Sequence, residues 1–184
     1  YGFEAPAAIL STKAARIDPY RASYRVLTRL EKQGVAVHDR SVVSRIETQP
    51  RSVLLETRDG HRVKARHLVM ATGYAAQQFI DQDVAKNRSS YAFVTDPIAP
   101  ELLGPLRHCM MWETARPYLY LRTTSDHRLI VGGEDDSIDI PARRDARVEK
   151  KARKLAQRVG ELFPQIAVEP VFSWAGTFAE TADG

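Results

Sequence analysis

Tyr118, Tyr120 and Arg122 are the strongest candidates for binding chemistry in this sequence of 184 residues. They alternate with Leu119 and Leu121, and alternate side chains of a β-strand lie on the same face. A guanidinium group can hold a carboxylate through two parallel hydrogen bonds, and neighbouring phenols can form the walls of a pocket. The pattern therefore predicts either a carboxylate-binding strand face or the amphipathic outer face of a sheet.

Other patterns that carry chemistry are missing from the sequence. It contains no GxGxxG or P-loop phosphate motif, and its five histidines and single cysteine, Cys109, lack the spacing of a zinc site. The run Glu134-Asp135-Asp136 could bind a cation, but it follows Gly132-Gly133 and we expect a solvated loop there. We therefore predict neither a metal site nor a catalytic acid or base.

The composition excludes several classes of protein. A hydrophobic fraction of 43% with 27% charged residues predicts a globular core. The net charge of +4 is spread along the chain and comes with no nucleic-acid recognition motif, so no nucleic-acid partner is expected. No apolar run is long enough to predict a membrane span. The single cysteine fits a reducing compartment, and we expect the cytoplasm.

One short apolar segment, His67 to Tyr74, is predicted to organise the chain. It ends in Ala71-Thr72-Gly73, which is typical of a buried strand with a tight exit. In α/β proteins, ligands bind at the carboxyl ends of such strands, where glycine allows close approach. Three β-like segments precede it, with Asp59-Gly60 as a tight turn; they are residues 41–47, 53–57 and 61–66.

The remaining elements predict a mixed α/β fold. A helix should begin at Asp18-Pro19, bury one face, and end near Gly34, and a longer helix should cover about residues 142–162. Asp126-His127 is predicted to form a hairpin turn. Short strands are expected at residues 35–37, 91–94, 110–112, 118–122, 129–131 and 166–174.

Several motifs occur in an order that resembles a known family. They are Ile17-Asp18-Pro19, Gly34 before a strand, Val43 to Ile46, Ala71-Thr72-Gly73, Gly132-Gly133-Glu134-Asp135, Phe163-Pro164, Trp174-Ala175-Gly176 and Thr181-Ala182-Asp183-Gly184. Together they resemble the FAD-dependent D-amino-acid oxidase family, which includes glycine, sarcosine and γ-glutamylputrescine oxidases. Because the GxGxxG unit of that family and its segment after the last Asp-Gly are missing, we expect this chain to be an internal piece of such an enzyme.

The resemblance implies two domains. Residues 1–17 and 86–172 would form a substrate-binding domain on a mainly antiparallel sheet. Residues 18–85 and 173–184 would form part of a Rossmann-like FAD-binding domain.

The resemblance also implies roles for single residues. Arg122 would bind the substrate carboxylate, and Tyr120 and Tyr91 would line the same pocket. The cofactor-binding positions would be Val43, Ala71, Thr72, Gly73, Trp174 and Gly176. The chain departs from the family at Asp126-His127-Arg128, where Asp-Gly-Arg is common, and Cys109 does not match a covalent flavin attachment.

The implied function is FAD-dependent oxidation of an amine or amino acid to an imine, by hydride transfer to the flavin. The substrate would be a small molecule. Two alternatives remain open: a binding or interaction module that keeps only the fold, and a flavin dehydrogenase of the glycerol-phosphate type, although no basic cluster around Arg122 favours a phosphate substrate.

Overall fold

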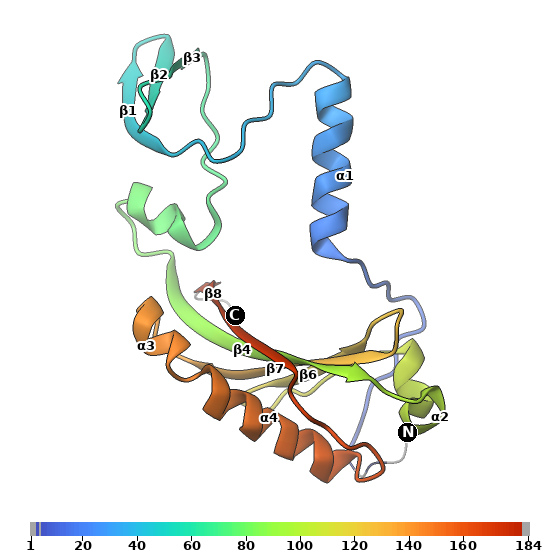
Figure 1. The fold of residues 1–184 in the computed structure, drawn as a ribbon. Coiled ribbons are helices and arrows are strands. Elements are labelled where there is room, and N and C mark those ends of the chain that lie inside the picture. The colour runs from blue at the N-terminus through green and yellow to red at the C-terminus, as the bar shows by residue number, and fades with distance from the viewer. Residues whose placement is uncertain (1–2, 4, 182–184) are drawn as a thin grey trace. The chain divides into compact units, whose positions relative to one another are not determined.

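The computed structural model describes residue 3 and residues 5–181. The chain divides into two units, Ser11–Ala71 and the residues on either side of that segment. Figure 1 shows the elements of both units, which are described separately below.

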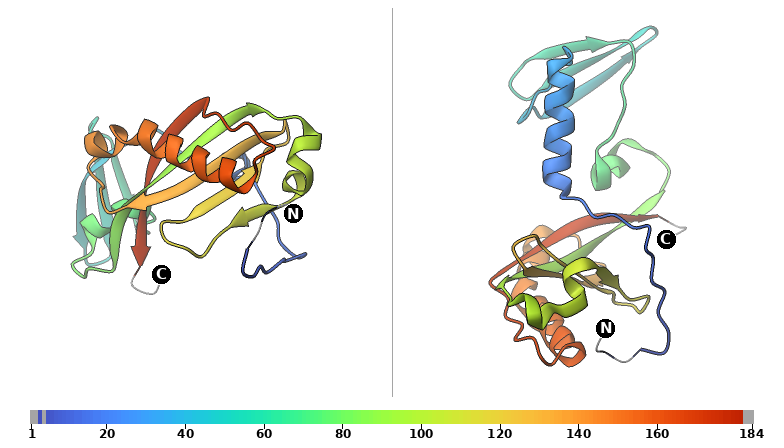
Figure 2. Two further views of the ribbon diagram at one scale, coloured as in Figure 1. Left: turned by 90° about the horizontal axis from the view of Figure 1, so that it is seen from below. Right: turned by 90° about the vertical axis from the view of Figure 1, so that its right-hand side faces the viewer.

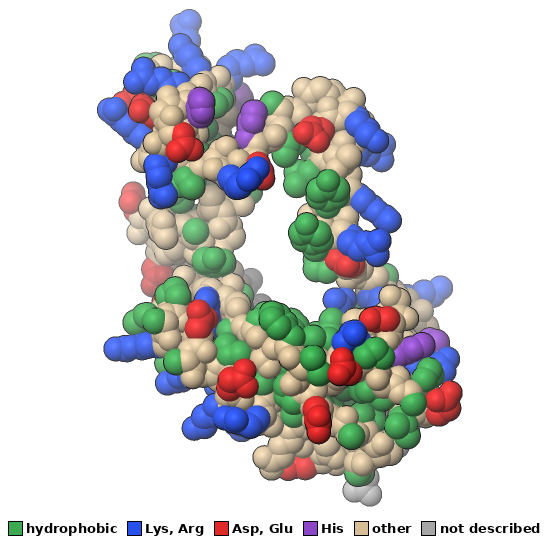
Figure 3. Space-filling model, in the orientation of Figure 1, with side chains coloured by type: hydrophobic (Ala, Val, Ile, Leu, Met, Phe, Trp, Pro, Cys, Tyr) green, Lys and Arg blue, Asp and Glu red, His purple; other side chains and the backbone are tan. Residues whose placement is uncertain are grey.

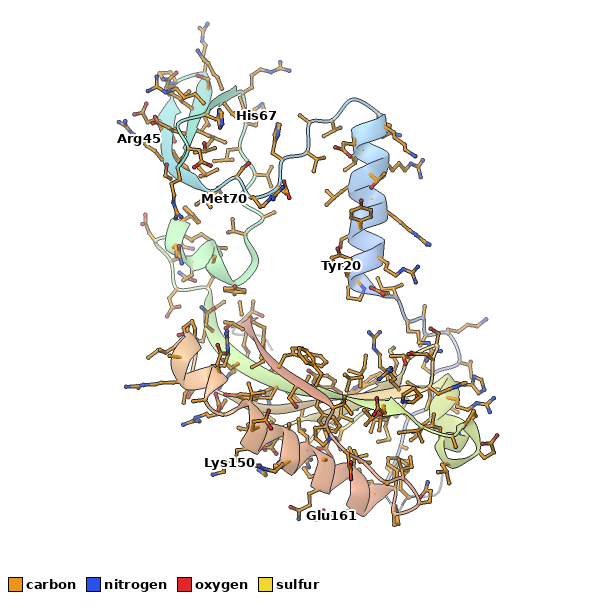
Figure 4. The ribbon with its side chains drawn as sticks, viewed as in Figure 1. Tyr20, Arg45, His67, Met70, Lys150 and Glu161 are labelled. Atoms are coloured by element: carbon orange, nitrogen blue, oxygen red, sulfur yellow. The ribbon has the colours of Figure 1, made fainter. Side chains whose placement is uncertain are left out.

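The smaller unit begins with helix α1 (Pro19–Lys32), whose ends form as predicted. The Asp18 carboxylate accepts a hydrogen bond of 3.0 Å from the backbone N–H of Arg21, and Gly34 has a φ of 88° just beyond the helix. The expected buried face is not observed, because α1 has no buried residue. Tyr20, labelled in Figure 4, is 78% exposed and stacks on Tyr24.

A three-stranded antiparallel sheet completes the smaller unit, in the order β1-β2-β3. Its strands are β1 (Val43–Gln49), β2 (Ser52–Thr57) and β3 (Arg62–Ala65). Gly60 occupies the turn between β2 and β3 with a φ of 83°. The three predicted β-segments and the Asp59-Gly60 turn are therefore confirmed.

The predicted strand from His67 to Tyr74 is wrong. Residues 67–72 have no regular secondary structure, and Val69 is 84% exposed. Figure 4 shows His67 and Met70 on this irregular segment. No strand in the described part of the chain pairs with it, so its apolar run has no sheet to enter. Gly73, with a φ of 58°, opens the 3₁₀ helix η1 (Gly73–Phe79).

The larger unit is organised around a five-stranded sheet with the order β5-β6-β7-β4-β8, in which all neighbours are antiparallel. The strands are β4 (Ala85–Pro97), β5 (Met110–Trp112), β6 (Leu119–Thr123), β7 (Arg128–Asp136) and β8 (Phe172–Thr181). The predicted mixed α/β class with antiparallel sheets is confirmed.

One face of this sheet is covered by helix α4 (Val148–Leu162), as Figures 1 and 2 show. Ala152, Leu155 and Val159 of α4 are buried against the sheet. Lys150 and Glu161 point away from the sheet in Figure 4 and are exposed. Three shorter helices, α2 (Pro100–Leu103), η2 (Gly104–His108) and α3 (Pro141–Asp145), complete the unit.

Three boundaries in this unit differ from the sequence-based expectation. The helix predicted over 142–162 is two helices, α3 and α4, joined through Ala146 and Arg147. The last strand begins at Phe172 rather than at residue 166, because residues 164–166 form a turn in which the backbone N–H of Ile166 donates to the carbonyl oxygen of Phe163 at 2.9 Å. Strand β7 continues through Gly132-Gly133 to Asp136 instead of ending there. In the described residues, no helix is long and apolar enough to cross a membrane.

Candidate functional site

The face of the five-stranded sheet that α4 does not cover, called the open face below, carries most of the candidate residues. The strand register aligns one residue from each strand in a row across this face. The row is Trp112, Tyr120, Gly132, Ala92 and Trp174. Gly132 and Ala92 contribute little or no side chain to this row, whereas its other three residues are aromatic. Figure 3 shows hydrophobic side chains gathered on this part of the surface.

Tyr120 lies across the centre of the row. A Cβ atom on Gly132 would lie 2.3 Å from Cζ and Oη of Tyr120, so the phenol ring rests directly on this glycine. The Tyr120 hydroxyl is 3.2 Å from Oγ of Ser90, within hydrogen-bond distance. Burial raises the pKa of the Tyr120 phenol. The ring is therefore held in one place and stays neutral near pH 7.

The first of two cavities lies on the Arg122 side of Tyr120. It has a volume of about 350 Å³ and is lined by Met110, Met111, Trp112, Glu113, Tyr118, Tyr120, Leu121, Arg122 and Ile130. Alternation along β6 places Tyr120 and Arg122 on the open face, while Leu119, Leu121 and Thr123 are buried. The Glu113 carboxylate is already paired with Arg158. Arg122 is the only cationic side chain among the described residues that line this cavity.

The second cavity lies between Tyr120 and Trp174. It has a volume of about 390 Å³ and is lined by Ser90, Ala92, Tyr120, Asp135, Trp174, Gly176, Thr177 and Phe178. Asp135 contributes its only charged side chain among the residues that the structure describes. Tyr120 borders both cavities, so it separates a cationic pocket from an anionic one.

A β-bulge in β7 directs Asp135 to the open face. Tyr91 of β4 pairs with Gly133 of β7, and Ser89 of β4 pairs with Asp136. Between these two pairs β4 advances by two residues and β7 by three, so β7 carries one extra residue. Glu134 adopts a positive φ of 54° within this bulge. As a result Glu134 points to the α4 side, where it is 2% exposed, and its neighbour Asp135 lines the second cavity. The solvated loop expected for Glu134-Asp135-Asp136 is therefore wrong.

Cations from α4 hold this bulge in place. Lys154 Nζ is 2.8 Å from Oε2 of Glu134, and Arg158 Nη1 is 3.4 Å from Oε1. Lys151 Nζ donates a hydrogen bond of 2.6 Å to the backbone carbonyl of Glu134. A carboxylate this deeply buried needs such partners, because an unpaired charge there would be costly.

Tyr91 lies on the opposite face of the sheet from Tyr120. It is 1% exposed and belongs to the core beneath α4. Its hydroxyl donates to Oδ2 of Asp136 at 3.1 Å, and burial together with this bond raises its pKa to about 12. Tyr91 lines neither of the two cavities described here.

The cofactor-binding positions implied by the family resemblance fall in both units. Val43 starts β1 and Ala71 lies in the irregular segment of the smaller unit. In the larger unit, Thr72 and Gly73 precede and open η1. Trp174 and Gly176 are brought together with Tyr120 around the second cavity. Whether these residues contact a cofactor stays a prediction.

Sequence reasoning missed Ser90 and Ala92, and it placed Asp135 in a solvated loop. The first two lie on β4 in a stretch that gives no motif. Asp135 could have been found from Gly132-Gly133-Glu134-Asp135, since paired glycines inside a strand often mark a bulge or a close approach. Here Gly132 supports the Tyr120 ring, and a Cβ on Gly133 would lie 1.9 Å from the carbonyl oxygen of Tyr118.

Comparison with solved structures gives proteins of the same fold. The chain is 14% identical to a flavoprotein/dehydrogenase from Cytophaga hutchinsonii, with a TM-score of 0.62 over 92% of this chain and 44% of that one. HpxO from Klebsiella pneumoniae, crystallised with FAD and uric acid, is 12% identical with a TM-score of 0.53, over 89% of this chain and 43% of that one. The Diels-Alderase PyrE3 of pyrroindomycin biosynthesis is 17% identical with a TM-score of 0.55, over 88% and 35% of the two chains.

This chain thus spans less than half the length of each of these three structures. A comparison with curated proteins found no match. The sequence profile of the family described as "FAD dependent oxidoreductase" (DAO) matches residues 3–184. The chain therefore belongs to the DAO family of FAD-dependent oxidoreductases, and FAD is the cofactor of that family.

Proposed function

We propose that the full-length protein carrying this chain oxidises the C–N bond of an amine or amino acid. The product is an imine, which water hydrolyses. One observation carries the proposal: Arg122 and Tyr120 share the open face of β6 and border one cavity whose other walls are mostly apolar. Such a cavity suits a small organic substrate that is anchored by a single carboxylate.

The open face also suits a flat aromatic cofactor. Ala92 adds little side-chain bulk between the ring of Trp174 and the ring of Tyr120, which covers Gly132. A Cβ atom on Gly176 would meet nothing within 4 Å. Within the larger unit we assign Trp174 and Gly176 to FAD, together with Thr72 and Gly73. When bound, FAD supplies the acceptor for the hydride.

Each residue of the first cavity has a role in this proposal. Arg122 holds the substrate carboxylate, which fixes the α-carbon relative to the sheet. Tyr120 cannot swing freely because Gly132 lies beneath it and Ser90 is at its hydroxyl. Met110, Trp112 and Ile130 give the cavity apolar walls. No proton acceptor is needed in the cavity if the amine binds in its neutral form.

The cavity favours a carboxylate over a phosphate. A phosphate carries more charge than a carboxylate and usually binds several donors. Here Arg122 is the only cation lining the cavity in the described part of the chain, and Glu113 adds a carboxylate to the same wall. This argues against the glycerol-phosphate type of dehydrogenase.

Replacing Arg122 tests the proposal. In the full-length protein, Arg122→Ala should raise KM for amino-acid substrates by about 10- to 100-fold, since a charged hydrogen bond is worth roughly 1.5–3 kcal/mol. Arg122→Lys should recover only part of the loss, because an ammonium group cannot bind a carboxylate in the bidentate way. Arg153→Ala, at an exposed position of α4, is the control with the same change of charge. An unchanged KM in Arg122→Ala would remove Arg122 from the substrate pocket.

A further inference from the structure

The bulge in β7 brings the carboxylate of Asp135 to the open face, and it does so at a cost. A regular strand beyond Gly132 would place Glu134 on the open face and Asp135 on the side of α4. The bulge reverses this order, but Glu134 must adopt a positive φ of 54°, which is uncommon for a residue other than glycine. It also needs Lys151 and Lys154 of α4 to bind the carbonyl and carboxylate of Glu134.

The Asp135 carboxylate lacks a partner at the position to which the bulge directs it. Its Oδ1 atom is covered from solvent and has no hydrogen-bond donor within residues 3 and 5–181. The guanidinium of Arg116 donates to Glu180 instead, at 2.8 Å. A shielded carboxylate oxygen without a donor is costly, so a donor for this oxygen is expected in the working protein.

The proposed function supplies such a donor, because it assigns the second cavity to the flavin. This cavity shares Tyr120 with the substrate cavity, and hydride transfer needs the flavin ring beside the substrate. The walls formed by Tyr120 and Trp174 suit the ring, whereas Asp135 would repel the pyrophosphate of FAD. The oxidised flavin ring carries a single N–H group, which can donate to the free oxygen of Asp135.

We propose that Asp135 accepts a hydrogen bond from the flavin ring and makes the bound flavin harder to reduce. Reduction by two electrons and one proton leaves a negative charge on the ring; the amine supplies them in turnover and a chemical reductant in the test. A carboxylate beside the ring opposes that charge, and more strongly in a cavity shielded from water.

The charge of Asp135 already acts on the opposite wall of the cavity. Burial is the main cause of the raised pKa of the Tyr120 phenol, and the negative charge of Asp135 raises this pKa further. A flavin ring between the two would lie in the same field. The inference rests on the proposed function only for the position of the ring.

The midpoint potential of the flavin tests the proposal. It is measured on the full-length, FAD-loaded protein without substrate, by reductive titration beside a reference dye. Asp135→Asn removes the charge at nearly constant shape and should favour the reduced flavin by about tenfold or more, a rise of about 30 mV for a two-electron couple. Asp135→Glu keeps the charge and should stay close to the wild-type potential. Glu149→Gln, at an exposed position of α4, is the control with the same change of charge and should leave the potential unchanged.

An unchanged or lowered potential in Asp135→Asn would overturn the inference. Weaker FAD binding by this variant at an unchanged potential would also overturn it, because Asp135 would then contact the ribityl chain instead of the ring. Asp135→Ser removes the same charge with a smaller side chain, and it gives the same comparison if Asp135→Asn does not fold.

The potential separates this inference from the oxidase function, because no substrate takes part in the measurement. A raised potential in Asp135→Asn, in a protein whose flavin no amine reduces, would keep Asp135 beside the ring and reject the amine oxidase. Bleaching of the flavin by an amine, with equal potentials in the wild type and Asp135→Asn, would keep the oxidase and reject the role of Asp135.

Discussion

Replacing Gly132 with alanine is expected to displace the Tyr120 ring and deform both cavities. The new Cβ atom would lie 2.3 Å from Cζ and from Oη of Tyr120, far inside van der Waals contact. The ring is the end of a rotatable side chain, so it should swing away and lose its contact with Ser90. We expect a cost of about 1–3 kcal/mol in the free energy of unfolding, from overpacking and from the lost hydrogen bond.

A double-mutant cycle isolates this contact. Unfolding of the full-length protein in urea would be followed by tryptophan fluorescence, because Trp112 and Trp174 lie in the same row of the sheet. In a Tyr120→Ala background the Gly132→Ala change should cost little, which gives a coupling energy of about 1–2 kcal/mol. Equal costs in both backgrounds would show that Tyr120 does not rest on Gly132, and the division into two cavities would then be wrong.

Three further predictions concern the framework of the site. Glu134→Gln should destabilise the protein by about 1–2 kcal/mol in thermal or urea unfolding, because Lys154, Lys151 and Arg158 lose their charge-assisted contacts with the buried Glu134 carboxylate while remaining partly exposed themselves; a neutral result would contradict the ion cluster. Gly133→Ala should prevent the bulge and lower the free energy of unfolding, because the new Cβ would lie 1.9 Å from the Tyr118 carbonyl oxygen and residue 133 has a φ of 136°; a variant as stable as the wild type in urea unfolding would contradict this. The pKa of Tyr91 is raised to about 12 in the folded protein, so its ionisation should leave the free energy of unfolding unchanged below pH 10 and lower it by about 2–3 kcal/mol between about pH 10 and 12. Tyr91→Phe should flatten that fall, and an unchanged pH profile in this variant would refute the prediction.

Local patterns predicted the elements whose own residues determine their structure. The ends of α1 follow from Asp18, Pro19 and Gly34, and each adopts the expected conformation. Alternation along β6 correctly placed Tyr120 and Arg122 on one face. The hairpin at Asp126-His127 also forms, although His127 must take a φ of 64°, which is unusual for a residue other than glycine.

Features that depend on distant partners could not be predicted from the sequence. The apolar run at His67 to Tyr74 has no neighbouring strand in the described chain and stays irregular. Tyr91 was placed in the pocket with Tyr120, whereas its position in β4 directs it into the core beneath α4. The bulge at Glu134 depends on Lys151 and Lys154, which lie on a different element.

The central claim is that the open face of the five-stranded sheet serves a flavin enzyme that oxidises amines. An anaerobic absorbance spectrum of the full-length protein, purified without added cofactor, tests this most directly. We predict a visible flavin band that an amino acid or amine bleaches, and slower bleaching in Arg122→Ala when the substrate carries a carboxylate. A protein that stays colourless and takes up no added FAD, or a bound flavin that no amine reduces, would contradict the claim.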